Sequence, residues 1–280
     1  MNHFNRLAAA IQAAVDAGKA ILDVYHSDFK VEYKEDESPL TLADKKAHDI
    51  ISTHLAMFEI PLLSEEGKTI PYETRRSWET LWIVDPLDGT KEFVKRNGEF
   101  TVNIALVTAG RPVLGVVFAP VREVLYFALQ GLGAFKMDST DTITALCAHT
   151  SHNGITSNDL VEKSIALPVE RDNDTPYTIV GSRSHATEAL ENFVEKKRRD
   201  FGTVDFIPAG SSLKLCLVAE GRADIYPRLA PTMEWDTAAG HAVVECAGAC
   251  IYNHASGEPI HYNKEDLLNP WFIVERPFRS

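Results

Sequence analysis

The stretch WIVDPLDGT at positions 82–90 joins a short apolar run to a turn that carries two acids. The apolar run predicts a strand that delivers Asp85 to its end, because Pro86 lacks the next ladder donor and Gly89 permits a tight turn. Asp85 and Asp88 are three positions apart across that turn, so both side chains can converge on one point. Converging carboxylates repel unless a cation lies between them, and ligation by oxygen alone suits Mg²⁺. Backbone amides that begin a helix or nest after this turn would add donors for a phosphate.

Taken alone, this stretch is equally compatible with a solvated turn, since Asp, Pro and Gly are common turn formers. Three further acidic segments bear on the choice. The segment LLSEEG at positions 62–67 ends an apolar run with Glu65 and a second acid, and its simpler interpretation is an exposed strand end. Asp236 lies where a helix is expected to start, where Asp is also a good N-cap. Asp44 lies at the start of the second expected helix, where the alternative is a capping-box-like arrangement with Asp44 at the third position.

Composition sets limits on the function. The chain has 280 residues, with 28 Lys and Arg against 40 Asp and Glu, and a formal net charge of −12. This acid excess argues against a general binder of nucleic-acid backbones, which needs a basic face. A small anionic ligand is still allowed, because bound divalent cations reverse the local charge.

From the sequence we expect neither a membrane span nor a secretory signal. No apolar run reaches the length of a membrane span, and the first six residues do not start a secretory signal. The four cysteines form no CxxC pair, so we expect reduced thiols and a cytoplasmic protein. Peripheral association with the inner membrane is an alternative, but no basic amphipathic segment supports it.

The order of elements predicts two domains. Helical periodicity predicts helices over residues 3–26 and 41–58, and the following strand-rich block favours antiparallel pairing. Residues 137–164 are polar and contain the expected boundary, with an α+β domain over 1–150 and an α/β domain over 151–280. In the second domain strands and helices alternate, which predicts a mostly parallel sheet with crossover helices. Small residues after Asp236 would let its helix pack closely.

Together, the acidic segments resemble the signatures of the lithium-sensitive, Mg²⁺-dependent phosphatase superfamily that includes inositol monophosphatases and fructose bisphosphatases. These signatures are a Glu-Glu segment, Asp-Pro-x-Asp-Gly-Thr and Trp-Asp-x-Ala-Ala-Gly, and all three occur here in that order. The resemblance covers essentially the whole chain. It implies an α/β fold, a five-layer αβαβα sandwich with an α+β first half.

Further residues resemble one subfamily. Inositol phosphatases usually have Thr-Asn-Phe where this chain has KEF at 91–93, followed by NGEFT at 97–101. These stretches, with GSRSH at 181–185 and GSSLK at 210–214, are similar to the bacterial CysQ-type 3'(2'),5'-bisphosphate nucleotidases. The implied substrate is 3'-phosphoadenosine 5'-phosphate (PAP), hydrolysed to AMP and phosphate in sulfur metabolism, with the phosphosulfate PAPS as a further candidate. An inositol or sugar phosphatase is the first alternative, and a non-catalytic metal or nucleotide sensor is the second.

The resemblance also implies a set of site residues. Two or three Mg²⁺ ions would be held by Glu65, Asp85, Asp88, Asp236 and the carbonyl of Leu87. Glu65, Asp44 and Thr90 would orient the water that attacks phosphorus in line. Since Asp236 comes from the second domain, the catalytic cleft should lie between the domains.

A bisphosphorylated nucleotide brings two anionic groups, of which the metals neutralise only one. The second phosphate needs cations or donors from the second domain, and Arg183, Lys214 and Arg228 are candidates, with Ser182, Ser211 and Ser212 as hydroxyl donors. Each basic residue could instead be an exposed salt-bridge partner. The complete set of expected substrate-binding residues is Glu65, Leu87, Asp88, Gly89, Thr90, Ser182, Arg183, His185, Gly210, Ser211, Lys214, Arg228 and Asp236.

Overall fold

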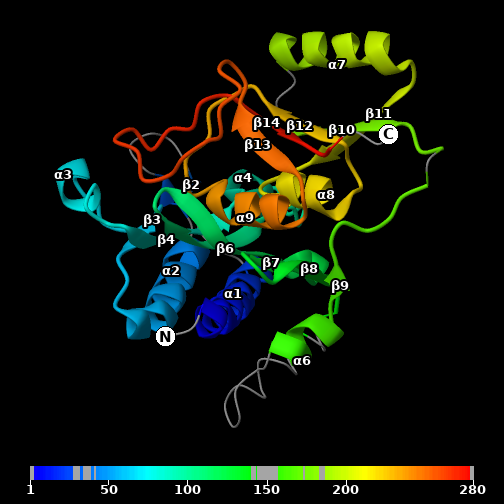
Figure 1. The fold of residues 1–280 in the computed structure, drawn as a ribbon. Coiled ribbons are helices and arrows are strands. Elements are labelled where there is room, and N and C mark those ends of the chain that lie inside the picture. The colour runs from blue at the N-terminus through cyan, green and yellow to red at the C-terminus, as the bar shows by residue number, and fades with distance from the viewer. Residues whose placement is uncertain are drawn as a thin grey trace.

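In the computed structural model of the chain, layers of helices alternate with two β-sheets (Figure 1). Helices α1 (His3–Tyr25) and α2 (Leu42–Leu55) cover one face of a seven-stranded first sheet. The structure describes residues 3–27, 32–33, 39–40, 42–139, 143, 157–172, 174–182 and 187–277. The expected site residues Arg183 and His185 lie outside these ranges.

The first sheet has the order β3-β4-β5-β6-β7-β8-β9. Its pairs are antiparallel, as predicted, apart from β3 and β4, which run parallel. The strands are β3 (Leu62–Ser64), β4 (Thr80–Asp88), β5 (Thr101–Thr108), β6 (Arg111–Ala119), β7 (Val124–Leu129), β8 (Gly133–Met137) and β9 (Ile165–Ala166). The short elements around it are β1 (Glu32–Tyr33), β2 (Pro39–Leu40), η1 (Ala56–Phe58), α3 (Tyr72–Arg75), α4 (Thr90–Val94), η2 (Pro120–Arg122) and α6 (Ser157–Glu162).

The two helices α8 (Leu213–Glu220) and α9 (Ala238–Cys246) form the layer between the two sheets. Nearly every side chain on both helices is buried, which is what two-sided packing requires. The expected close packing of α9 is confirmed, because a Cβ at Gly115 of β6 would lie 2.2 Å from the carbonyl oxygen of Ala239. A Cβ at Gly240 would lie 2.9 Å from Cβ of Leu215 on α8. The helix that follows Asp236 is thus seated directly on the first sheet.

The second sheet has five strands in the order β11-β10-β12-β14-β13. They are β10 (Tyr177–Ser182), β11 (Val204–Ala209), β12 (Ile225–Arg228), β13 (Cys250–Asn253) and β14 (Phe272–Glu275). Helix α7 (Glu188–Phe201) covers its outer face, where Phe193 and Val194 pack against Ile179, Ile225 and Ile273. This completes the αβαβα sandwich that the sequence predicted.

The second sheet is not parallel throughout, because four of its strands run in one direction and β14 runs against them. β10 pairs in parallel with β11 and β12, but β14 pairs antiparallel with both β12 and β13. β14 was absent from the predicted elements, and the segment that leads into it from β13 contains no helix. Without a crossover helix the chain turns back, so β14 enters the sheet in the opposite direction.

The passage from the first sheet to the second falls later than residue 150. β9 pairs with β8, Leu160 packs into the core beneath the first sheet, and the N–H of Leu167 donates to the carbonyl of Ala134. The second sheet then starts at Tyr177. None of the helices in the described ranges combines the length and the apolar character needed to cross a membrane.

The contact between β6 and α9 yields a stability prediction. Gly115→Ala should lower the free energy of unfolding by about 1–3 kcal/mol, because the new methyl meets a backbone carbonyl that cannot rotate away. Urea denaturation of the purified chain measures the change. Ala242→Gly removes the nearby Ala242 methyl but not the carbonyl, so it should fail to rescue Gly115→Ala; full rescue would show that α9 is not seated as described.

Candidate active site

Two neighbouring strand ends bring Glu65 and Asp85 to the same edge of the first sheet. β3 and β4 are parallel, with Ser64 opposite Val84, so both strands end in the same direction. The N–H of Glu65 donates to the carbonyl of Val84 at 3.2 Å, which fixes Glu65 beside the residue that precedes Asp85. The two acids that the sequence predicted at separate strand ends are therefore held on adjacent strands.

The turn from Asp85 to Asp88 is a local irregularity of β4. Asp85 lies opposite Asn103 and Asp88 opposite Thr101, so β4 carries one more residue than β5 in this interval. The N–H of Leu87 donates to Oδ1 of Asp85 at 3.0 Å, which orients this buried carboxylate.

Gly89 then allows the chain to enter α4 with a left-handed φ of 94°. A Cβ at this position would lie 3.2 Å from the carbonyl oxygen of Glu99. Thr90 begins the helix, and its hydroxyl donates to the carbonyl of Leu87 at 3.4 Å. The expected partnership of Thr90 with Asp44 stays a prediction.

Ser212 ties Asp88 of the first sheet to the segment that carries Asp236. Oδ2 of Asp88 accepts the N–H of Ser212 at 2.6 Å and lies 2.8 Å from its hydroxyl oxygen. That hydroxyl is also 2.6 Å from the carbonyl oxygen of Asp236, and its single proton can go to only one of them at a time. Ser212 was expected to donate its hydroxyl to a remote phosphate. In the structure it is buried instead, between Asp88 and the segment that carries Asp236.

Asp236 does not cap helix α9. Its Oδ2 accepts the N–H of Met233, three residues earlier, at 2.9 Å, and α9 begins only at Ala238. The N-cap interpretation of this acid is therefore set aside. The carboxylate is held by the turn before the helix.

Electrostatics show that the acids face one another. Burial, with the charges of Glu65, Asp88, Asp236 and Asp44, raises the pKa of Asp85 well above its usual range. Burial and the charge of Asp88 raise the pKa of Asp236 to about 8. Asp44, from the first turn of α2, is itself buried. Acids from distant parts of the chain thus share one low-dielectric region.

The acidic region fits a hard divalent cation by its chemistry. All of its donors are carboxylate or carbonyl oxygens, which Mg²⁺ prefers, and the mutual repulsion just described is what a cation would relieve. Backbone N–H groups hold one oxygen each of Asp85, Asp88 and Asp236, and so orient these carboxylates. In the described ranges, no three carboxylate, imidazole or thiol side chains are already gathered tightly enough to hold a metal ion.

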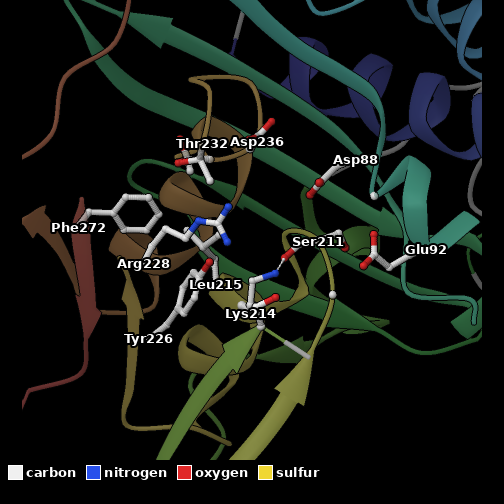
Figure 2. Close-up of a pocket in the computed structure, with 14 residues that line it drawn as sticks. Asp88, Glu92, Ser211, Lys214, Leu215, Tyr226, Arg228, Thr232, Asp236 and Phe272 are labelled. Atoms are coloured by element: carbon white, nitrogen blue, oxygen red, sulfur yellow. Dashed lines mark hydrogen bonds between the residues drawn. The ribbon is translucent and has the colours of Figure 1, made fainter. Parts of the chain in front are cut away.

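A pocket opens beside Asp88 and Asp236 and continues between β12, β14 and the start of α8 (Figure 2). Its volume is about 130 Å³. The acidic Asp88 and Asp236 lie at one end of the pocket and the basic Lys214 and Arg228 toward the other (Figure 2), where Glu92 also lies against Gly210. The pocket is lined by Asp88, Gly89, Glu92, Ser182, Gly210, Ser211, Lys214, Leu215, Tyr226, Arg228, Thr232, Asp236, Thr237 and Phe272.

Lys214 is the buried cation of the pocket. Its Nζ donates to the carbonyl of Ser211 at 2.5 Å and lies 5.7 Å from the ring centroid of Tyr226. Burial, together with the charge of Arg228, lowers the pKa of Lys214 to about 8, although the charge of Asp88 opposes the shift. The ammonium group is thus held where an anion would stabilise its charge.

Two polar atoms beside Lys214 lack a hydrogen-bond partner in the described part of the chain. They are the buried Oγ of Ser211 and Nε of Arg228. Ser211 has a left-handed φ of 41°, and Gly210 before it has no room for a side chain against Glu99. A tightly constrained turn therefore holds the unused hydroxyl of Ser211, and strand β12 holds the unused Nε of Arg228, at this part of the pocket.

Most expected site residues lie around the acidic region or the pocket, but several residues of these two places were not predicted. Asn103 donates from Nδ2 to Oδ2 of Asp88 at 3.4 Å and to Ser212 at 2.9 Å. A single Asn inside the apolar strand VNIALV was a signal that could have revealed it. Tyr226 and Phe272 gave no such signal, because aromatic side chains on strands are usually core residues.

Comparisons with known proteins agree with this arrangement. Residues 5–275 match the model of the inositol monophosphatase family. A 3'(2'),5'-bisphosphate nucleotidase CysQ of Salmonella typhimurium is 44% identical over 96% of this chain and 98% of its own length. The corresponding protein of Escherichia coli K12 is 44% identical over 94% of this chain and 96% of its own length.

Solved structures give the same result. A crystal structure of CysQ from Bacteroides thetaiotaomicron, a bacterial member of the inositol monophosphatase family, superposes with a TM-score of 0.86, at 50% identity and 97% coverage of both chains. An IMPase of Thermotoga maritima superposes with a TM-score of 0.69 at 24% identity, covering 97% of this chain and 92% of its own, which supports the fold alone.

The clustered acids predict how stability depends on pH in EDTA. A folded-state pKa near 8 for Asp236, against 3.8 for the ordinary group, means that the folded chain binds more protons between these values. The free energy of unfolding should then fall as pH rises from about 4 to 8, by at most about 1.4 kcal/mol per pH unit for each such group. Urea titrations at several pH values measure the slope. Asp85→Asn and Asp236→Asn should each flatten it, and unchanged slopes would contradict the clustering.

Proposed function

The chain belongs to the inositol monophosphatase family, and on that premise we propose that it is a Mg²⁺-dependent phosphatase that removes the 3'-phosphate of PAP. The observation that carries this proposal is the single pocket with carboxylates at one end and Lys214 with Arg228 at the other. A substrate with two phosphates can place one at each end. The bisphosphate nucleotidase names of the similar bacterial proteins support the same choice.

The metal ions would be held by the acids that the sequence predicted. Glu65, Asp85, Asp88 and Asp236 would hold the ions through their carboxylates, and the carbonyl of Leu87 would complete the set. Bound Mg²⁺ would neutralise phosphate charge, lower the pKa of a bound water and stabilise the leaving oxygen. We propose two or three Mg²⁺ ions, the number that the resemblance to the phosphatase superfamily implies.

The protein's own groups would position the attacking water. Glu65 is fixed to β4 through its N–H, and Thr90 stands at the start of α4 with its hydroxyl near the carbonyl of Leu87. With Asp44 nearby in the first turn of α2, these side chains would accept hydrogen bonds from the water and align it opposite the leaving group, and a carboxylate, Glu65 or Asp44, would take its proton. Rigid placement on strand ends and helix starts favours this role.

The second phosphate would bind at the basic end. Lys214 supplies a charge, and Arg228 and Ser211 supply donors that have no other partner among the described residues. Ser182 and Gly210 line the same end. Arg183 and His185 stay predicted contributors.

The main test is phosphate release with PAP, 3'-AMP and inositol 1-phosphate, each with and without Mg²⁺. We expect Mg²⁺-dependent release and a kcat/KM for PAP at least about tenfold above that for the other two, since only PAP presents a group to the basic end. Asp88→Asn should abolish turnover in all cases. A preference for inositol 1-phosphate would favour the sugar-phosphatase alternative, and binding of PAP without release would favour the sensor.

Lys214 gives a second, pH-dependent test. The ammonium is protonated below a pKa of about 8, so the ratio of kcat/KM for PAP to that for 3'-AMP should fall as pH rises above 8. Lys214→Met should lower that ratio by about 10–100-fold at pH 7 and remove its pH dependence, because one charge-assisted hydrogen bond is lost. Both substrates use the same metal site, so the ratio of the two kcat/KM values cancels the effect of pH on metal binding. An unchanged ratio in Lys214→Met would exclude the residue from phosphate binding.

A further inference from the structure

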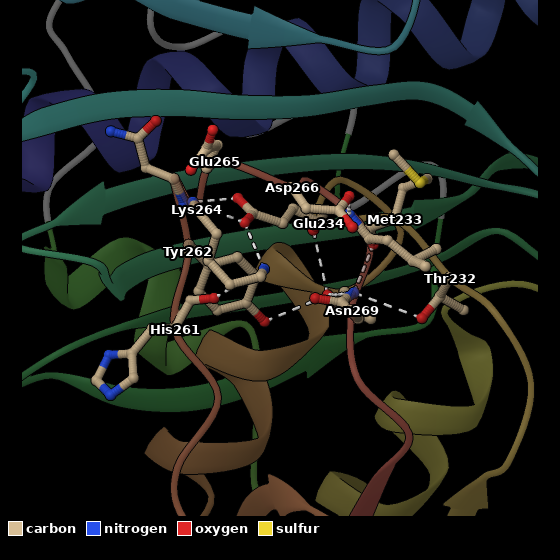
Figure 3. Close-up of polar contacts among 12 residues, drawn as sticks. Thr232, Met233, Glu234, His261, Tyr262, Lys264, Glu265, Asp266 and Asn269 are labelled. Carbon is tan, nitrogen blue, oxygen red and sulfur yellow. Dashed lines mark hydrogen bonds and ion pairs between the residues drawn. The ribbon is translucent and has the colours of Figure 1, made fainter. Parts of the chain in front are cut away.

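Glu234, two residues before Asp236, is a fully buried carboxylate that the reaction does not use. Its Oε2 accepts the N–H of Asn263 at 2.6 Å, and its Oε1 accepts the N–H of Lys264 at 3.0 Å and the ammonium of Lys264 at 2.5 Å (Figure 3). Every one of these partners is a donor. The carboxylate therefore binds one short stretch of the segment between β13 and β14.

Asn263 turns that stretch toward Glu234. Its left-handed φ of 63° is a conformation that Asn tolerates better than most residues, and it points two successive N–H groups at the carboxylate. The Asn263 side chain faces the other way. Its Oδ1 accepts from Nη1 of Arg75 at 3.1 Å, and its Nδ2 donates to the carbonyl of Arg75 at 2.7 Å.

Arg75 brings in the first sheet. It lies in α3, on the connection that leads from β3 and Glu65 to β4, and it is only 3% exposed. Its guanidinium also donates to the carbonyls of Lys264 and, at 2.7 Å, of Glu265. Continuous polar contacts thus run from the connection after Glu65, through residues 263–265, to the turn that carries Asp236.

The turn itself has a second support on the same segment. Nδ2 of Asn269 donates to the carbonyl of Met233 at 2.7 Å and to the hydroxyl of Thr237 at 3.0 Å (Figure 3). Met233 is the residue whose N–H holds the carboxylate of Asp236. A shift of the segment would therefore move the donor that orients Asp236.

We propose that Glu234, Lys264, Asn263 and Arg75 form a brace that sets the position of Asp236 relative to Glu65 and Asp85, and with it the affinity for the divalent cation. These are positioning residues, since none of them faces the substrate pocket. An apolar contact could hold the segment as firmly as this buried ion pair, but only directional hydrogen bonds fix its register. The inference rests on the proposed function, because it assumes a cation between these acids.

The test measures Mn²⁺ binding by isothermal titration calorimetry on the metal-free chain, without substrate. Glu234→Gln replaces an acceptor oxygen by an NH₂ group that must face a donor. It should weaken Mn²⁺ binding by about 10-fold, as is common when a group that orients a metal ligand is changed. Asn263→Gly keeps the left-handed backbone and the contacts to Glu234 but removes the link to Arg75, and it should weaken Mn²⁺ binding in the same direction.

The matched control is Glu220→Gln. Glu220 is also a buried carboxylate in the second half of the chain, bound by Lys136 Nζ at 2.8 Å and by the hydroxyl of Tyr126 at 2.9 Å, but it lies at the far end of α8 from the site. Glu220→Gln should lower the free energy of unfolding in EDTA and leave Mn²⁺ affinity unchanged.

The outcomes separate the possibilities. Weaker Mn²⁺ binding in Glu234→Gln and Asn263→Gly, with wild-type affinity in Glu220→Gln, supports the brace. Wild-type affinity in a folded Glu234→Gln, or equal weakening in Glu220→Gln, overturns it. If Glu234→Gln does not fold, Asn263→Gly decides alone, and wild-type affinity there overturns the proposal. If the wild-type chain binds no Mn²⁺, the proposed function itself fails and the brace falls with it.

Discussion

Carboxylates that are buried together repel one another, and the rest of this structure is organised around that repulsion. Asp85 is buried at the end of β4, and the charges of acids from a second strand, a helix and the other half of the chain all raise its pKa. In water such charges would separate, since desolvation and mutual repulsion both disfavour them. Here strand pairing, a bulge and backbone N–H groups hold them in place. A cation would stabilise such a site in its ionised form, and this is the physical basis for proposing a cation-dependent activity.

The second half of the chain must reach this region accurately, because Asp236 is useful only beside Asp88. Two features achieve this without long side chains. Gly115 lets the backbone of α9 lie directly on β6, and Ser212 joins the Asp88 carboxylate to the Asp236 carbonyl. The proposed brace adds a third connection, from the turn that carries Asp236 through residues 263–265 to Arg75. Close backbone packing resists displacement more than flexible side-chain contacts do, and it places a loop acid with the precision of a strand residue.

Structural features that depend on neighbouring residues were predicted well from the sequence. The turn from Asp85 to Asp88 depends on Pro86 and Gly89 within the same few residues, and the periodicity of α1 and α2 follows from one buried face. Contacts between distant segments could not be predicted in this way. Asn263 and Arg75 are 188 positions apart, and Ser212 and Asp88 are 124 apart, so no local pattern marks either pair.

The direction of β14 could not be predicted for the same reason. A strand pattern shows that a segment is extended, but the direction of β14 depends on whether a helix or a plain loop precedes it. Residues such as Asp236 could be predicted from the resemblance to a family, because their motif carries information that periodicity does not.

The distribution of charge in the pocket bears on which substrate it selects. The chain carries a net charge of −12, and an anionic ligand would be repelled by the acids around Asp88 unless cations were already there. At the opposite end, Lys214 and Arg228 attract an anion without any metal. A substrate with one phosphate can use only one of these ends, whereas a bisphosphate uses both and is oriented by their difference. Preference for two phosphates and the choice of which one is cleaved would therefore have the same cause, the opposite charge of the two ends.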